Sequence, residues 1–403
     1  MKVIHIACGN TPIQPTGAGG VQKDLYFLTK YLSQLDCNAG VIDISPEVHR
    51  KLQTGAKIHT VWNPPISGEF CGTRSHIIKV CIFSILAAFR LYWLLKEDKI
   101  DIIHTHGQFP GAAILVFKWL LGWSHAIVHT IHSSHILMNP TKVNKLKYFL
   151  EVIVLNKVDL VITETETGRR QLESVFNIKP EKIAVVPQGL NLTEINDFVE
   201  KNRVDAREDK GHVVLYVGRV CPRKNQLLLI KAVPKVLQRF LKTRFVFVGP
   251  IEDSSYFGRI SRLIKNGKLD SSVEFTGEFT GNRLFETYKN ASIFAFPTLY
   301  ETQGVVLLEA MAFGLPVVAS DIGPIRDVVS LEKDSALLVD PDHVDAIADA
   351  IIQLLGDESL KEKLITRGKN LVSSKFSWPQ IANRMLGVYK DVIHSQKERK
   401  EGS

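Results

Sequence analysis

Two carboxylates stand eight positions apart in the segment YETQGVVLLEAMAFGLPVVAS, residues 300–320. Glu301 lies in a turn-like stretch after an apolar run, and Glu309 lies inside a block of helical periodicity that Gly304 begins. Paired carboxylates can act on a glycosidic bond when they lie roughly 5 to 9.5 Å apart. Because Glu309 would lie more than two turns into the helix, different roles are favoured: Glu309 accepts hydrogen bonds from hydroxyls, and Glu301 lies near a sugar.

A basic loop with the sequence GRVCPRKN, residues 218–225, follows an expected strand at residues 213–217. Arg219 and Lys224 would bracket an anion above the sheet, and this arrangement suits a diphosphate. The loop has no GxxxxGK[ST] pattern, so it is not the P-loop of a nucleoside triphosphatase. A solvated basic loop without a ligand remains the alternative at this point.

A glycine-rich segment, TGAGG at residues 16–20, directly precedes a helix expected at residues 21–35. Glycines before a helix let backbone amides approach a phosphate or a sugar, and the helix dipole favours an anion there. The segment lacks the GxGxxG spacing, so a dinucleotide site is not favoured. An ordinary loop between a strand and a helix remains the alternative.

Six histidines lie between residues 104 and 135. His104 and His106 end one expected strand, and His132 and His135 follow another, so these pairs would line the same edge of a sheet. The sequence has no HExxH motif and no carboxylate ligand nearby, so we predict no metal site. A single histidine that acts through hydrogen bonds at a reaction centre is the favoured interpretation.

The elements that position these residues alternate between strands and helices along the whole chain. A length of 403 residues favours two domains. The strands are mostly continuous Val/Ile runs, as expected for parallel sheets covered on both faces. The charged stretch at residues 194–211 is predicted to be a linker between the domains. Two doubly wound domains that face each other would form a cleft.

The composition is typical of a soluble globular protein, with 45% apolar and 23% charged residues. The five scattered cysteines form no CxxC motif, so neither a disulfide framework nor a zinc ribbon is indicated, and a reducing compartment fits best. The start, MKVIHIAC, reads as a core strand and not as a signal peptide. No spanning helix is predicted, because Lys79 and Arg90 interrupt the longest apolar run, residues 77–95.

The net charge of +8 is unevenly distributed, because residues 102–150 contain four lysines and no Asp or Glu. Two interpretations stay open: a buried helix pair with a solvated lysine edge, or a face that binds an anionic membrane surface. Nucleic acid is not an expected partner, because there is no dense Lys/Arg cluster with interleaved aromatics. We therefore expect a cytoplasmic protein, with peripheral association at the cytoplasmic face of the membrane as the open alternative.

Together these motifs resemble family 4 of the nucleotide-sugar glycosyltransferases. The resemblance covers nearly the whole chain and includes GRVCPRKN, the E-x7-E segment, DIIHTHG, VHTIHSS, VVPQGLN, VEFTGEF and FSW. It implies an α/β protein of the GT-B fold, with two Rossmann-like doubly wound domains that face each other across a cleft. The implied domains are an acceptor-side domain at residues 1–200, a nucleotide-sugar domain at 201–375, a helix at 376–395 that crosses back to the first domain, and a charged tail at 396–403.

The resemblance implies a retaining transfer of a hexose-type sugar from a nucleotide-diphosphate donor to a hydroxyl acceptor, either a glycan or a lipid. The family uses no cofactor and no metal at the site. By position, Arg219 and Lys224 would hold the donor diphosphate and stabilise the leaving nucleotide. Glu309 would bind the ribose of the nucleotide, and Glu301 would contact the transferred sugar.

The resemblance also assigns roles to four backbone positions and two histidines. Amides at Gly304 and Val305 would contact the hydroxyls or the phosphate of the donor. His132 matches the histidine at the reaction centre of the family, and His106 would lie on the acceptor side. Two glycines of the first domain would approach the phosphate: Gly19 and Gly20.

Two departures from the family pattern lie near the donor pocket. Gln303 stands where the family often has an apolar residue, and VPQGLN replaces the commoner turn with N-G. The nucleotide and the sugar of the donor therefore stay open. The sequence also leaves the acceptor and the oligomeric state open. The alternative functions are a nucleotide-sugar epimerase, a glycan phosphorylase or a non-catalytic partner that binds sugar nucleotides.

Overall fold

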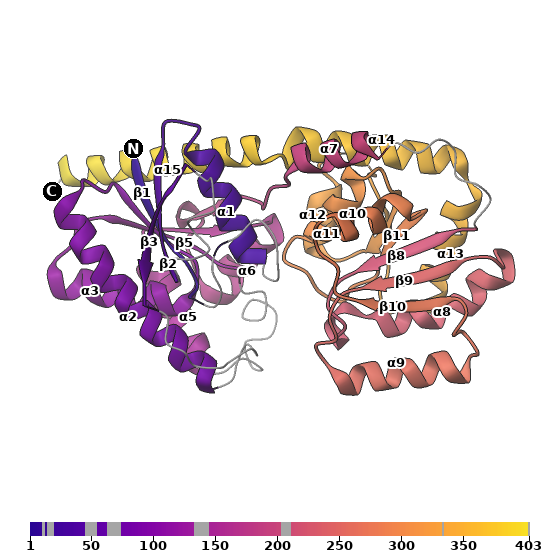
Figure 1. Ribbon diagram of the computed structural model, residues 1–403. Coiled ribbons are helices and arrows are strands. Elements are labelled where there is room, and N and C mark those ends of the chain that lie inside the picture. The colour runs from indigo at the N-terminus through magenta and orange to yellow at the C-terminus, as the bar shows by residue number, and fades with distance from the viewer. Residues whose placement is uncertain are drawn as a thin grey trace. The chain divides into compact units, whose positions relative to one another are not determined.

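The computed structural model describes residues 1–9, 13, 20–44, 55–62, 74–132, 145–202, 211–332 and 334–401. The chain divides into two compact units, which are described separately. Unit 1 comprises Met1–Gly189 with Trp378–Ser403, and unit 2 comprises Leu190–Ser377 (Figure 1). Gly19, which the resemblance places near the donor phosphate, and His135 lie outside the described residues.

Unit 1 is built on a parallel sheet of seven strands in the order β3-β2-β1-β4-β5-β6-β7. The order reverses between β1 and β4, which are direct neighbours. Strands β4 and β5 are buried along their whole length, as their Val/Ile-rich sequences predict. The strands are β1 (Lys2–Ile6), β2 (Asn38–Ile44), β3 (Lys57–Val61), β4 (Ile102–Thr105), β5 (Ala126–Thr130), β6 (Leu160–Thr163) and β7 (Ile183–Val185).

Helices cover both faces of this sheet. Residues of α1 and of the final helix α15 share one hydrophobic cluster with the sheet, and residues of α2, α3 and α5 share another on the opposite face. Trp378 and Tyr389 of α15 are buried, so the last helix of the chain is part of the core of unit 1. The helices are α1 (Gly20–Leu32), α2 (Arg74–Glu97), α3 (Gln108–Leu121), α5 (Lys145–Lys157), α6 (Glu166–Phe176), η3 (Pro180–Lys182) and α15 (Trp378–Glu401).

Unit 2 is built on a parallel sheet of six strands in the order β10-β9-β8-β11-β12-β13, which reverses between β8 and β11. Its strands are β8 (Val213–Val217), β9 (Arg244–Val248), β10 (Val273–Gly277), β11 (Ile293–Phe296), β12 (Val317–Ser320) and β13 (Leu337–Val339). Its helices are α7 (Leu192–Lys201), η4 (Pro222–Lys224), α8 (Gln226–Arg239), α9 (Ser254–Asn266), α10 (Gly281–Asn290), α11 (Val305–Ala312), α12 (Gly323–Val329), α13 (Val344–Gly356) and α14 (Glu358–Lys375).

The structure corrects the linker prediction for residues 194–211. Its first part belongs to α7, an amphipathic helix of unit 2. Ile195 and Phe198 are buried, and the Phe198 ring lies 5.4 Å from the ring of Phe285, between centroids. The high charge of the segment hid this short apolar stripe, because the charges occupy the solvent face of the same helix.

The predicted fold class is confirmed. Both units are Rossmann-like parallel sheets with helices on their faces, and each strand order reverses once. The reversal matters for function, because loops that leave the two central strands diverge there and create room for a ligand at the carboxyl ends of the strands.

Candidate active site

Two loops of unit 2 leave the carboxyl ends of β8 and β11, the two strands between which the strand order reverses. The loop after β8 carries Lys224, and the loop after β11 carries Glu301. The sequence separation of 77 residues between these side chains is closed by the pairing of the two strands. Lys224 and Glu301 therefore meet at the position where doubly wound sheets bind ligands.

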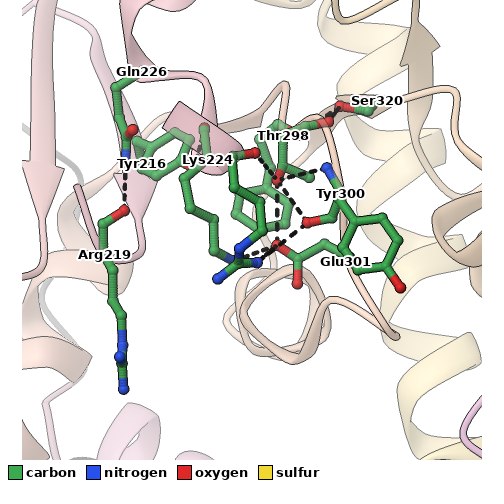
Figure 2. Close-up of polar contacts among 10 residues, drawn as sticks. Tyr216, Arg219, Lys224, Gln226, Thr298, Tyr300, Glu301 and Ser320 are labelled. Atoms are coloured by element: carbon green, nitrogen blue, oxygen red, sulfur yellow. Dashed lines mark hydrogen bonds and ion pairs between the residues drawn. The ribbon is translucent and has the colours of Figure 1, made fainter. Parts of the chain in front are cut away.

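Lys224 and Glu301 form a hydrogen-bonded ion pair, in which the Lys224 ammonium group donates to Glu301 Oε1 (Figure 2). Both residues are largely buried, with 9% and 8% of their surfaces exposed. Arg223 Nη1 lies 4.0 Å from the same carboxylate oxygen. Two cations beside one carboxylate leave an excess of positive charge, which favours an anionic ligand.

The backbone around Lys224 is held by side chains of the core. The Tyr216 hydroxyl donates to the Lys224 carbonyl at 2.6 Å. Asn225 adopts a left-handed conformation with φ of 58°, which asparagine tolerates better than most residues. Its amide nitrogen donates to the carbonyls of Pro297 and Pro341, at 2.9 and 2.8 Å. The loop is therefore fixed before any ligand binds.

The loop that carries Glu301 is organised around Thr298. The Thr298 hydroxyl lies 3.3 Å from Glu301 Oε1 and 3.1 Å from the Tyr300 carbonyl oxygen. The Ser320 hydroxyl donates to the Thr298 carbonyl, so β12 also supports the turn (Figure 2). Groups fixed in this way can stabilise developing charge without reorganising during the reaction.

Arg219 lies apart from this cluster. Its guanidinium group pairs with Glu252 at 2.9 Å in an exposed position, and Figure 2 shows its side chain pointing away from Lys224 and Glu301. The structure instead brings Arg223, which the sequence analysis did not single out, to the carboxylate. Arg223 is adjacent to Lys224 in the same basic loop, so the charge pattern could have indicated it. The predicted contact of Arg219 with a diphosphate stays a prediction.

Gly304 begins α11, and Val305 is the first residue of that helix. The Gly304 backbone has φ of 85°, which places it in the left-handed region that favours glycine. A Cβ atom at this position would lie 2.7 Å from Ile325 Cδ1. The N-terminus of α11 therefore starts next to the Glu301 loop, where its backbone amides favour an anion.

Replacement of Gly304 by alanine is expected to lower the free energy of unfolding by about 1–3 kcal/mol, because the left-handed conformation is strained for alanine and the methyl group meets Ile325. Thermal unfolding measures this effect. Gly258→Ala in α9 is the control, because nothing lies within 4 Å of its Cβ position. Equal midpoints for Gly304→Ala and the wild type would contradict the prediction.

Glu309 is positioned by α11 and α10. The Tyr288 hydroxyl of α10 donates to Glu309 Oε2 at 3.0 Å, and 7% of the Glu309 surface is exposed. Glu301 is held by a lysine, whereas Glu309 is held by a tyrosine, so the two carboxylates have different electrostatic surroundings. This difference supports separate roles for them.

Gln303, which departs from the family pattern, is fully buried.

Unit 1 brings three polar side chains together at the carboxyl ends of β4, β5 and β6. His106 Nδ1 lies 3.1 Å from His132 Nε2, and His132 Nδ1 lies 3.4 Å from Glu164 Oε1. His5 Nδ1 extends this chain of groups at 3.0 Å from His106 Nε2. The sequence analysis selected His106 and His132 but missed His5 and Glu164. Glu164 directly follows a strand and could have been found, whereas His5 reads as a core residue.

The environment separates the protonation states of these histidines. Burial lowers the pKa of His5 to about 3 and holds that of His106 well below its usual value, so both imidazoles are neutral. Burial also acts to lower the pKa of His132, but the Glu164 hydrogen bond and the charges of Asp24 and Glu164 outweigh it and raise that pKa. Among His5, His106 and His132, His132 is therefore the one that carries a proton most readily.

His5, His104 and His106 place their ring nitrogens within 4.8 Å of one another, a spacing that a metal ion could use. His104 already has partners outside this cluster. His104 Nδ1 lies 2.6 Å from the Tyr389 hydroxyl, and His104 Nε2 lies 2.7 Å from Thr130 Oγ1. Hydrogen bonding thus accounts for both nitrogens of His104 but leaves His5 Nε2 buried without a hydrogen-bond partner among the described residues. The predicted lack of a metal at the site stays a prediction.

A small cavity of about 10 Å³ adjoins the His132 side chain within unit 1. Asp24, His106 and Glu164 contribute to its wall, and Trp378 and Met385 of α15 also line it. This volume holds about one water molecule. Burial raises the pKa of Asp24 to about 7, and the charge of Asp24 in turn helps to raise the pKa of His132.

Comparison with known proteins decides the family. The family described as "Glycosyltransferase Family 4" matches residues 18–194, and "Glycosyl transferases group 1" matches residues 198–371. Phosphatidyl-myo-inositol mannosyltransferase of Mycobacterium tuberculosis is 30% identical over 311 residues, 75% of this chain and 76% of that protein. The chain belongs to glycosyltransferase family 4.

Two further similarities extend over almost the whole chain. D-inositol 3-phosphate glycosyltransferase of Corynebacterium glutamicum is 25% identical over 418 residues, 98% of each protein. The solved structure of Anabaena HepE with UDP and glucose has a TM-score of 0.73 at 18% identity and covers 97% of this chain and 100% of that one. The predicted family, the GT-B fold and the glycosyltransferase class are confirmed.

Proposed function

We propose that the protein is a retaining glycosyltransferase that moves a hexose-type sugar from a nucleotide-diphosphate donor to a hydroxyl acceptor. The observation that carries this proposal is the buried ion pair between Lys224 and Glu301, with Arg223 beside it, at the switch point of unit 2. This cluster combines two cations that can bind a diphosphate with a carboxylate that can accept hydrogen bonds from sugar hydroxyls.

The chemistry follows from charge. The bond between the anomeric carbon and the diphosphate breaks as the nucleotide leaves, so negative charge grows on the phosphate oxygens. Lys224 and Arg223 would stabilise this charge. Once a phosphate oxygen binds the Lys224 ammonium group, Glu301 loses part of its partner and becomes free to accept hydrogen bonds from the sugar. Because the chain supplies the cations itself, we propose that the donor site uses no metal and no cofactor.

The remaining contacts are proposed from the resemblance to the family. Glu309 would bind the ribose, and the amides of Gly304 and Val305 would bind the donor at the start of α11. Gly20 begins α1 of unit 1, in the position where its amide could serve a phosphate. His132 would hydrogen-bond the transferred sugar, and His106 would support it on the acceptor side.

The relatives suggest which substrates to test first. Two of them are named for inositol-containing acceptors, one a phosphatidyl lipid and one a phosphate ester, and a structural neighbour holds UDP and glucose. We therefore propose a lipid, lipid-linked or glycan acceptor with a free hydroxyl, and a cytoplasmic reaction.

Thermal stabilisation by UDP-, GDP- and ADP-sugars tests the donor assignment. A donor at 100 times its dissociation constant adds about 2.7 kcal/mol to the free energy of unfolding. One donor is expected to stabilise the wild type but not Lys224→Ala. NMR of the product formed with an inositol phosphate or a lipid acceptor should show that the anomeric configuration of the donor sugar is retained. Equal stabilisation of both proteins would overturn the site, and an inverted product would overturn retention.

A further inference from the structure

The outer face of α2, α3 and α5 in unit 1 carries large apolar side chains in solvent. Helix α3 packs against both α2 and α5, so the three helices form one layer. Trp119 is 81% exposed, which does not fit the interpretation of residues 102–150 as a buried helix pair. We define the apolar face by six residues that are each more than half exposed: Phe89, Trp93, Trp119, Leu120, Leu146 and Phe149.

Helix α2 shows how this face is built. Ile85, Phe89 and Trp93 recur every four residues and form one stripe that is half exposed. Phe83 and Ala87 lie on the opposite side and are fully buried in the core of unit 1. Within the part of the chain that the structure describes, Ile77–Glu97 is the one helix long and apolar enough to cross a membrane. Because its inner side packs on the sheet, α2 is placed to lie along a surface.

Basic residues outnumber acidic residues on the three helices of the apolar face. The first acidic residue of α2 is Glu97, at its end, and α3 has none. The first acid of α5 is Glu151, which is 1% exposed and lies 3.3 Å from His129. The three helices carry six cationic residues after Arg74 and before Glu151: Lys79, Arg90, Lys96, Lys118, Lys145 and Lys147.

We propose that the apolar face docks on the surface of an anionic lipid bilayer. Trp119 and Leu120 would enter the boundary between headgroups and acyl chains, and Lys145 and Lys147 would lie near the lipid phosphates. Tryptophan favours this boundary because it has an apolar ring and a polar N–H group. A second copy of the chain fits this face less well, because a symmetric dimer through it would bring two surfaces with the same excess of positive charge together.

This inference deepens the proposed function, since it would bring the enzyme to a lipid acceptor, but its test requires no catalysis. Full-length protein is sedimented with phosphatidylcholine vesicles that contain about 30 mol% phosphatidylglycerol, or none, at about 0.1 M salt. We expect binding to the anionic vesicles. The double variant Trp119→Glu/Leu120→Glu should bind them at least about tenfold more weakly, because it loses apolar insertion and adds negative charge.

Leu241→Glu is the matched control. Leu241 lies in unit 2 and is 84% exposed, so this variant changes an equally exposed apolar residue outside the apolar face. It should bind vesicles like the wild type. A second pair, Lys145→Gln/Lys147→Gln, should weaken binding to anionic vesicles severalfold and reduce its salt dependence. Circular dichroism and thermal unfolding verify that each variant is folded.

Four results would overturn the proposal. The wild type could fail to bind anionic vesicles, it could bind neutral vesicles equally well, or Trp119→Glu/Leu120→Glu could bind as the wild type does. In the fourth result the wild type forms a dimer that Trp119→Glu/Leu120→Glu disrupts, and neither protein binds vesicles. The last result would assign the face to a second copy. Transfer to a soluble acceptor separates the two proposals: vesicle binding without transfer would contradict the proposed function alone.

Discussion

Replacement of Lys224 by alanine is expected to lower kcat/KM for sugar transfer by about 10³-fold or more. Removal of one fixed group that stabilises transition-state charge typically costs about 2.7–4 kcal/mol, or 10²- to 10³-fold. Lys224 would also bind the ground-state diphosphate, so the Michaelis constant for the donor should rise as well. The measurement is steady-state transfer with the donor identified by thermal stabilisation.

The same substitution affects stability, because Glu301 is left buried with a weaker partner. Breaking a buried ion pair from one side typically costs about 3–5 kcal/mol, and Arg223 at 4.0 Å should offset part of that cost. The double variant Lys224→Ala/Glu301→Gln removes both charges and should regain most of the lost stability. It should not regain transfer, so it separates a loss of the site from a loss of the fold.

Lys235→Ala is the matched control for this experiment. Lys235 lies on α8 of the same unit and pairs with Asp345 and Asp349 in solvent, at 3.0 and 2.7 Å. Exposed pairs contribute about 0–1 kcal/mol. Transfer at the wild-type rate by Lys224→Ala, with Lys235→Ala unchanged, would remove Lys224 from the proposed mechanism.

Replacement of His132 by alanine is expected to lower kcat/KM by about 10²-fold or more, the scale of a positioned group that exchanges protons or hydrogen bonds with a substrate. Both ring nitrogens of His132 face partners within unit 1, namely His106 and Glu164. These contacts orient the ring. His394→Ala on α15 is the control, since that histidine is exposed and pairs with Glu398 on the same helix.

Glu164→Gln tests how this histidine is tuned. The groups that act on the His132 pKa are Glu164, Asp24 and Glu151, and His106 contacts the ring directly. Removing the Glu164 charge should lower the His132 pKa, because burial then dominates. NMR titration of the imidazole between about pH 5 and pH 9 measures the change. An unchanged titration would contradict the assigned role of Glu164.

The sign of the stability effect follows from the raised pKa. A histidine whose folded-state pKa exceeds its unfolded value of 6.5 contributes stability fully below 6.5 and loses that contribution as the pH rises through the folded-state pKa. The wild type should therefore exceed Glu164→Gln in stability most clearly at acidic pH. The difference should shrink above neutral pH.

The order of strands and helices was predictable because it depends on local patterns. Continuous apolar runs such as β8 and β11 indicate strands covered on both faces, and loops at their ends carry the polar residues. The carboxyl ends of neighbouring parallel strands meet at one edge, so Lys224 and Glu301 could be expected near a ligand from the sequence itself. Helix α7 was missed because its charged face dominated its composition.

Only the tertiary structure decided which side chains meet. Arg219 and Arg223 lie in one loop, but the turn through η4 and left-handed Asn225 brings Arg223 to Glu301 and leaves Arg219 with Glu252. His5 joins His106 from 101 residues away through strand pairing. The apolar face on α2, α3 and α5 could not be distinguished from a buried face, because a hydrophobic sequence alone does not indicate which side of a helix packs on the sheet. Burial and long-range pairing are properties of packing, so they appear only when the chain is folded.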